Sequence, residues 1–477
     1  MHRFTLDAMF LLAGAIAGKL LAQVFLIVAA RRLSVSDFAA LAIGMATAQI
    51  LADLVLRVNA NVVMRAASSS TSAGGLLRWS MGLNRRAILS TSVAFVTVII
   101  ALQFTSRAGV AVALAAGSFL PLAGLRLGAA ALVVAGSNTE RALYSDLVVP
   151  LIGLLLLVPA SIYGGLTAFA LTFTLGQAVG FAVLFFAKAR GELSVYRPAE
   201  IDLSFTSSGG TKTFAQSTYW MSNIKNVTRW GDTLLIGAIL GFESSGRYAA
   251  IAALPAGIDL ITQRIGGLAA ADGARVADRQ GPTQLGSLLR TSSGAALLLA
   301  VPASAVLIGA ASPILLVMYG GEFEVGAQAL RLLILASLVR ASFAGDSPLV
   351  IAADGHRREV GYSFASAVVV TMTSAMGAVM FGLTGFAAGR LIGEVVSRLY
   401  RYTQFQALVG VKVHILRRNL VALAKASAVG VGAALAIGYL GLSPFRSIAI
   451  VGLLTFCCLA ILDFTKYRQL LNPGAVS

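Results

Sequence analysis

Charged residues and cysteines are scarce in this chain of 477 residues. Lys, Arg, Asp and Glu together make up only 12% of it, whereas hydrophobic residues make up 57% and the mean hydropathy is +0.84. Soluble domains carry about 25% charged residues, so this composition excludes an ordinary soluble fold. The apolar runs 108–135, 148–187 and 421–439 meet or approach the length that crosses about 30 Å of hydrocarbon. They lack the alternation of a membrane β-barrel, and we expect an all-α polytopic membrane protein.

Metal-binding and catalytic motifs are also missing. Cys457 and Cys458 are neighbours in the last apolar run, where adjacent helix side chains point about 100° apart, so no disulfide between them is expected. His2, His356 and His414 have no Cys or carboxylate ligand set nearby, and we predict no metal site. The chain has no phosphate-binding Gly-x-x-x-x-Gly-Lys-Ser/Thr motif. We therefore expect a protein that is not an enzyme and carries no cofactor.

Apolar runs between polar breaks predict about fourteen membrane-spanning helices. The expected spans are 8–30, 38–60, 87–105, 109–135, 142–163, 166–187, 214–240, 247–271, 290–310, 327–352, 361–381, 384–408, 420–440 and 445–464. If both termini lie in the cytoplasm, most loop Lys and Arg fall on the inner side, in agreement with the positive-inside rule. The net charge of +17 is then an orientation signal, and no nucleic-acid partner is expected. The few outer cations are Arg31, Arg32, Arg107, Arg247 and Arg446.

The second half of the sequence resembles the first at an offset of 210 residues, which places Lys19 on Arg229 and 38–42 on 248–252. Similar segments also open the sixth and twelfth spans. A parallel repeat of this kind predicts two pseudo-symmetric six-helix bundles. The expected parts are an N-terminal bundle in 1–190, a cytoplasmic linker in 191–212, a C-terminal bundle in 213–410, and two further transmembrane helices with a tail in 411–477.

Charged side chains inside the predicted spans are the main functional signal, because each costs about 2.5–3.5 kcal/mol at the bilayer centre. Lys19 lies four residues before Gln23 on the first span, so both share one helix face. On the seventh span Lys225, Arg229 and Asp232 are spaced i, i+4 and i+7 and form one polar stripe. Lys19 and Arg229 lie too deep in their spans to reach the headgroups easily.

A second polar face is duplicated between the two halves. Gln49 and Asp53 are one turn apart on the second span, and at the same offset they correspond to Asp259 and Gln263 on the eighth. Further charges lie on the fourth, tenth and twelfth spans. These are Arg126, Arg340, Asp346 and the ladder Arg390, Glu394 and Arg398.

Two interpretations of the intramembrane charges stay open. They either form ion pairs that only fix helix packing, or line a water-filled cavity. Because cations outnumber carboxylates, we predict a cavity for an anionic substrate. The predicted substrate-binding cations are Lys19, Arg229, Lys225, Arg126 and Arg340, and the candidate counter-ions or coupling-ion ligands are Asp53, Asp232, Asp259 and Glu394.

Several segments resemble a known family. The stretch 29–38, Ala-Ala-Arg-Arg-Leu-Ser-Val-Ser-Asp-Phe, resembles a segment that follows the first span of polysaccharide flippases. These proteins belong to the multidrug/oligosaccharidyl-lipid/polysaccharide (MOP) exporter superfamily. The order and spacing of the similar segments match the family over about residues 5–410. Ala39 replaces the glycine that usually follows Phe38. Other similar segments are 232–237 with 246–248, 318–323 with 327–336, and 382–388.

The resemblance implies a flippase of the bacterial inner membrane that moves an undecaprenyl-pyrophosphate-linked oligosaccharide, the repeat unit of a surface polysaccharide, to the periplasmic leaflet. It implies alternating access by a monomer, coupling to Na⁺, H⁺ or the membrane potential, and a polysaccharide polymerase or chain-length regulator as partner. Two rivals stay open within the superfamily: a flippase of the peptidoglycan precursor, and a cation-coupled multidrug antiporter, whose cavity should be net acidic. A membrane glycan polymerase or ligase is a third possibility, disfavoured by the lack of a large outer loop with grouped carboxylates.

Overall fold

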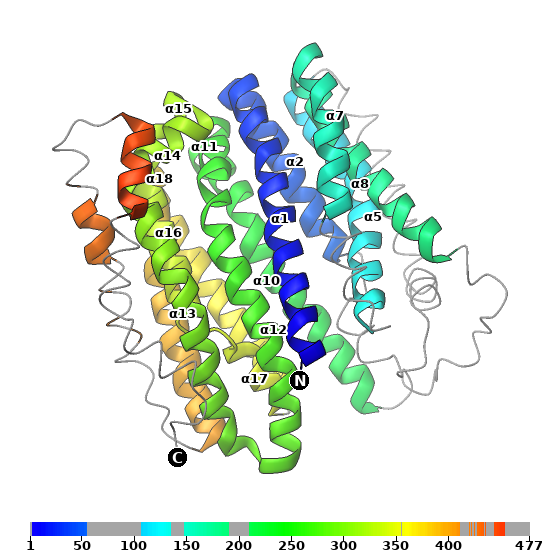
Figure 1. Ribbon diagram of the computed structural model, residues 1–477, viewed down its shortest axis with the longest axis vertical. Helices are drawn as coiled ribbons and strands as arrows, with labels where there is room; N and C mark the ends of the chain where they lie inside the picture. The colour runs from blue at the N-terminus through cyan, green and yellow to red at the C-terminus, as the bar shows by residue number, and fades with distance from the viewer. Residues whose placement is uncertain are drawn as a thin grey trace. The chain divides into compact units, whose positions relative to one another are not determined.

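In the computed structural model the described residues are almost all helical, and no strand occurs among them (Figure 1). The expected all-α fold class is therefore confirmed. The predicted third span, 87–105, and most of the predicted linker lie outside the described residues, as do Cys457 and Cys458. The residues described are 2–54, 106–134, 147–189, 209–353, 355–410, 443–453 and separate positions between 419 and 435.

Helices of the first half coincide with the spans predicted from hydropathy. Between α7 and α8 the chain turns at Gly164 and Gly165, whose φ angles of 66° and 85° suit glycine because a Cβ would clash with its own backbone there. The helices are α1 (His2–Arg32), α2 (Val35–Leu54), α5 (Arg107–Val134), α7 (Val149–Tyr163) and α8 (Leu166–Ala189).

Two of the spans predicted in the second half are broken. The eighth divides at Pro255, which starts a new helix because proline has no N–H to donate to the preceding turn. The tenth divides at Gly345, which has a φ of 97°. The helices are α10 (Gly209–Leu240), α11 (Phe242–Ala253), α12 (Pro255–Gln280), α13 (Leu285–Gly309), α14 (Ala311–Tyr319), α15 (Gly321–Glu324), α16 (Ala327–Ala341), α17 (Asp346–Ala352) and α18 (His356–Val409), with a 3₁₀ turn, η3, at Pro282–Gln284.

The long α18 is two antiparallel helices that meet at a tight turn. Gly382 has φ 63° and ψ −144°, outside the helical region, so the chain reverses there as the predicted spans 361–381 and 384–408 require. Gly377 lies against Gly385, and a Cβ on Gly389 would clash with the carbonyl oxygen of Thr373. Glycines therefore let the two backbones touch, as is common for helices packed in a membrane.

Small residues also set the helix contacts of the first half. Gly176 lies against Gly153 of α7 and Gly180 against Val149, so the Gly-x-x-x-Gly pair of α8 is in a helix interface. On its other side α8 packs against α5, where Ser118 and Thr174 share a hydrogen bond of 3.1 Å. Helix α2 in turn packs against α5 and α10.

The chain divides into two compact units. The first comprises Met1–Ala250 with Gly355–Thr371, and the second comprises Ile251–Asp354 with Met372–Ser477. These divisions fall inside α11 and α18, and the predicted bundles 1–190 and 213–410 stay a prediction. In the part of the chain that is described, six helices are long and apolar enough to cross a membrane, as expected of a multi-pass membrane protein.

Candidate functional site

Arg126 joins α5 to α2 in the first unit. Its guanidinium forms an ion pair with the Asp53 carboxylate and donates a hydrogen bond to the side-chain oxygen of Gln49, one turn away on α2. It also donates to the Gln49 main-chain oxygen, at 3.3 Å. Asn226 of α10 donates to that same oxygen at 2.7 Å. Three helices thus meet at one polar cluster, in which the arginine, the carboxylate and the two amides are joined by hydrogen bonds.

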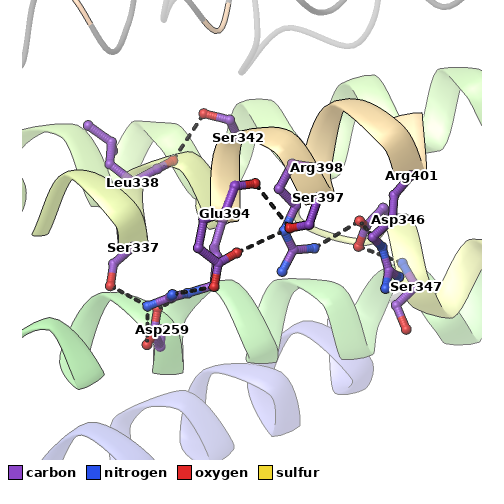
Figure 2. A network of polar contacts seen from close by, with 11 residues as sticks. Asp259, Ser337, Leu338, Ser342, Asp346, Ser347, Glu394, Ser397, Arg398 and Arg401 are labelled. Atoms are coloured by element: carbon purple, nitrogen blue, oxygen red, sulfur yellow. Dashed lines mark hydrogen bonds and ion pairs between the residues drawn. The ribbon is translucent and has the colours of Figure 1, made fainter. Parts of the chain in front are cut away.

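Arg340 of α16 plays the corresponding part in the second unit. Its guanidinium binds both oxygens of the Asp259 carboxylate of α12, at 3.0 and 2.9 Å, and one oxygen of Glu394 of α18, at 2.7 Å. The hydroxyl of Ser337 accepts a further hydrogen bond from it, at 2.7 Å. Figure 2 shows these three partners, Asp259, Ser337 and Glu394, converging on one guanidinium group.

In the repeat that the sequence predicts, the two arginines occupy related places. Arg126 lies on the fourth span and Arg340 on the tenth, and each binds the second span of its own half. The position of Gln49 corresponds to Asp259, so the carboxylate that balances the arginine has moved by one turn between the halves. Both arginines were predicted to bind substrate, and both have a carboxylate in contact. Their charge is already balanced by the protein itself.

Glu394 and Arg398 of the predicted ladder on α18 belong to the same network as Arg340. Asp346, at the start of α17, accepts from Arg398 at 2.9 Å and from Arg401 at 3.1 Å, and Arg398 is 3.5 Å from Glu394 (Figure 2). Arg401 lies near the end of the predicted span 384–408 and is buried, with 6% of its side chain exposed. Ion pairing that fixes helix packing is the interpretation that this geometry favours for the ladder.

The charged residues of the polar stripe on α10 differ in their exposure. Lys225 and Arg229 are exposed, whereas Asp232 is buried and accepts a hydrogen bond of 2.7 Å from the hydroxyl of Tyr248. The Arg229 guanidinium lies 5.6 Å from the ring centre of Trp230. The surface that α10 presents is therefore cationic, although the stripe contains a carboxylate.

The two predicted lysines of the first unit have different surroundings. Lys19 is half-buried on α1, one turn before the buried Gln23. Lys225 forms an ion pair of 3.3 Å with Glu359, which lies near the start of α18. The Glu359 side chain is fully buried. Glu359 was not predicted as a site residue, because it lies between the predicted spans 327–352 and 361–381. Glu359 lies in the first turn of α18, where acidic residues are enriched. That enrichment at a helix start is the sequence signal that could have revealed Glu359.

Metal ligands do not gather in the described part of the chain, where no group of three or more His, Cys, Asp and Glu is placed to hold an ion. The four carboxylates predicted as counter-ions or coupling-ion ligands all have side-chain partners. Asp53, Asp259 and Glu394 each contact an arginine, and Asp232 contacts Tyr248.

No protein-family model and no curated protein sequence matches this chain. Solved structures are nevertheless similar. The lipid II flippase MurJ, in an inward closed conformation, has a TM-score of 0.64 at 11% identity, and the match covers 96% of this chain and 100% of that one. The MATE multidrug transporter DinF-BH has a TM-score of 0.60 at 14% identity, and the match covers 85% of this chain and 96% of that one.

A third similar structure is an outward-facing multidrug resistance MATE family transporter of the MOP superfamily. Its TM-score is 0.57 at 14% identity, and the match covers 85% of this chain and 97% of that one. Identities this low show the fold alone. The chain therefore has the all-α, polytopic fold of MOP transporters, which confirms the fold class that the sequence predicts.

Proposed function

We propose that this protein is a flippase that moves lipid-linked oligosaccharide from the cytoplasmic to the periplasmic leaflet of the bacterial inner membrane. One observation carries the proposal: α10 exposes Lys225 and Arg229 within a predicted membrane span while its carboxylate, Asp232, is buried. Exposed cations within a membrane span are costly, and an anionic substrate would balance their charge. The undecaprenyl-pyrophosphate group is such an anion, and its prenyl tail stays in the lipid.

We assign two roles to the five predicted cations. Lys19, Lys225 and Arg229 bind the pyrophosphate and any acidic sugars, because ammonium and guanidinium groups are the protein's usual phosphate ligands. Arg126 and Arg340 hold neighbouring helices together through the carboxylates that they contact. Of the predicted coupling-ion ligands we assign that role to Asp232, which is buried and accepts a hydrogen bond from the Tyr248 hydroxyl.

The direction of transport has a physical source. A pyrophosphate that moves outward runs with an inside-negative potential, which supplies about 2.3 kcal/mol per charge for each 100 mV. The two halves rock about the substrate and expose it to each side in turn, as repeated transporters do. Both termini lie in the cytoplasm, the protein acts as a monomer, and a polysaccharide polymerase or chain-length regulator receives the product.

The decisive test removes one deep cation at a time, in Lys19→Ala and Arg229→Ala. Each variant should accumulate in the membrane as folded protein, while surface glycan disappears and lipid-linked oligosaccharide collects inside the cell. Arg31→Ala is the matched control, because Arg31 is an exposed cation at the end of α1. It should export glycan normally. Normal export by both deep variants would reject the site.

A peptidoglycan-precursor flippase is the second candidate, and the similarity to the MurJ structure favours it. Both candidates require cations for a pyrophosphate, so the exposed α10 surface does not distinguish them. A transport assay with reconstituted protein would distinguish the two candidates. Lipid-linked oligosaccharide and the peptidoglycan precursor are assayed separately, and only one of the two lipids should be transported across the membrane. A drug antiporter for cationic substrates is disfavoured, because Lys225 and Arg229 would repel such substrates.

A further inference from the structure

Glu359 is a carboxylate to which the proposed function gives no part. It lies in the first turn of α18, within the first unit, and its side chain is fully buried. One of its oxygens is 3.3 Å from the Lys225 ammonium and accepts a hydrogen bond of 3.2 Å from the Ser363 hydroxyl, one turn further along the helix. The carboxylate is therefore fixed from its own helix and faces a cation on another.

The pair is asymmetric in exposure. The Lys225 side chain is 45% exposed, whereas that of Glu359 is 0% exposed. An ammonium group has three N–H donors on a flexible four-carbon stem, so Lys225 is able to contact Glu359 and still offer donors to a second anion at the surface. The carboxylate has no comparable freedom, because leaving a buried charge without its cation is costly.

We propose that Glu359 is a built-in counter-anion of the substrate site, a positioning residue that weakens the hold of Lys225 on the transported anion enough for its release. This inference rests on the proposed function. A carrier must bind its substrate well enough to select it and loosely enough to let it go. A fixed negative charge beside Lys225 sets that balance, because it competes with the substrate for the same ammonium group.

The test measures binding and transport separately, with the full-length chain in lipid nanodiscs and in proteoliposomes. The probe is undecaprenyl pyrophosphate without sugar. Glu359→Gln keeps the shape and the oxygen that accepts from Ser363 but removes the charge. We expect it to bind the probe about fivefold more tightly, the size of a partly exposed ion pair, and to transport it more slowly. A merely structural role would weaken binding and transport together.

Two further variants fix the cause. Lys225→Ala should bind the probe more weakly, and adding Glu359→Gln to it should change nothing, because the counter-anion acts only through Lys225. Ser363→Ala removes a hydrogen bond but no charge, and it should leave the affinity close to that of the wild type. If Glu359→Gln does not fold, Glu359→Asp withdraws the carboxylate by one methylene and should tighten binding in the same direction.

The outcomes separate this inference from the proposed function. If the wild type binds and transports the probe but the folded Glu359 variants bind it no more tightly, the counter-anion role is wrong and the flippase proposal stands. Tighter binding that persists without Lys225 would also overturn the role. If the wild type binds undecaprenyl pyrophosphate no better than a neutral polyprenol, both proposals fail.

Discussion

Arg340 offers the sharpest test of the ion-pair network, because removing it leaves two carboxylates without their shared cation. The side chains of Asp259 and Glu394 are only 21% and 8% exposed. Loss of one partner from a buried pair costs about 3–5 kcal/mol, and a lone charge in the membrane interior costs about 2.5–3.5 kcal/mol. Glu394 keeps a contact with Arg398, which reduces the penalty. We therefore expect Arg340→Gln to lower the free energy of unfolding by about 3 kcal/mol.

The assay is reversible unfolding of the purified protein in mixed micelles as the fraction of denaturing detergent rises. Arg331→Gln is the matched control, because Arg331 lies on the same helix and donates to a backbone oxygen, that of Ile308, at 3.2 Å. It should cost about 1 kcal/mol, the usual net value of one hydrogen bond. Arg340→Gln with Asp259→Asn should recover stability to within about 1 kcal/mol of the wild type, because Glu394 keeps its contact with Arg398 and no stranded carboxylate remains.

Three results would refute this reasoning. Wild-type stability in Arg340→Gln would mean that Asp259 and Glu394 reach water or another cation without strain. Equal losses in Arg340→Gln and the Arg331 control would mean that arginine packing matters and the carboxylate pairing does not. Failure of the double variant to recover would place the cost in hydrogen-bond geometry, because Asp259 would be neutral and Glu394 would still contact Arg398.

Further expected outcomes concern α5 and α18. Arg126→Gln should reduce the amount of folded protein in the membrane. Adding Asp53→Asn should restore most of it, because this second change removes the stranded carboxylate. Quantitative blotting of membrane fractions measures both amounts, and equal levels in the single and double variants would contradict the pairing. Gly389→Ala should cost about 3 kcal/mol in the same unfolding assay, since its Cβ would press on the Thr373 carbonyl oxygen, whereas Gly361→Ala, with open space around it, should be neutral. Similar stability of these two glycine variants would show that Gly389 and Thr373 are not in contact.

The helices themselves could be predicted from the sequence. The spans expected at 38–60, 109–135 and 166–187 correspond to α2, α5 and α8, because hydropathy along a membrane helix is a local property. The predicted spans 247–271 and 327–352 run through the breaks at Pro255 and Gly345. Proline and glycine are tolerated inside membrane helices, so a hydropathy pattern cannot tell a kink from a break.

The polar face of α2 was also predictable, but its partner was not. Gln49 and Asp53 share a face because they are four residues apart, which periodicity alone establishes. That Arg126, 73 residues further along, meets them depends on the packing of α5 against α2. The same holds for Lys225 and Glu359, which lie on different helices far apart in the sequence.

The sequence by itself determined that this chain is an all-α, polytopic protein with costly charges inside its predicted spans, because composition, run length and i, i+4 spacing act within single helices. Only the tertiary structure decided which cations face carboxylates and which reach the surface. Arg126 and Arg340 contact carboxylates of neighbouring helices, Arg229 is exposed, and Lys225 is exposed but also contacts Glu359. The physical reason is that the free energy of a buried charge depends on its neighbours in space, and helix packing brings those neighbours from distant parts of the chain.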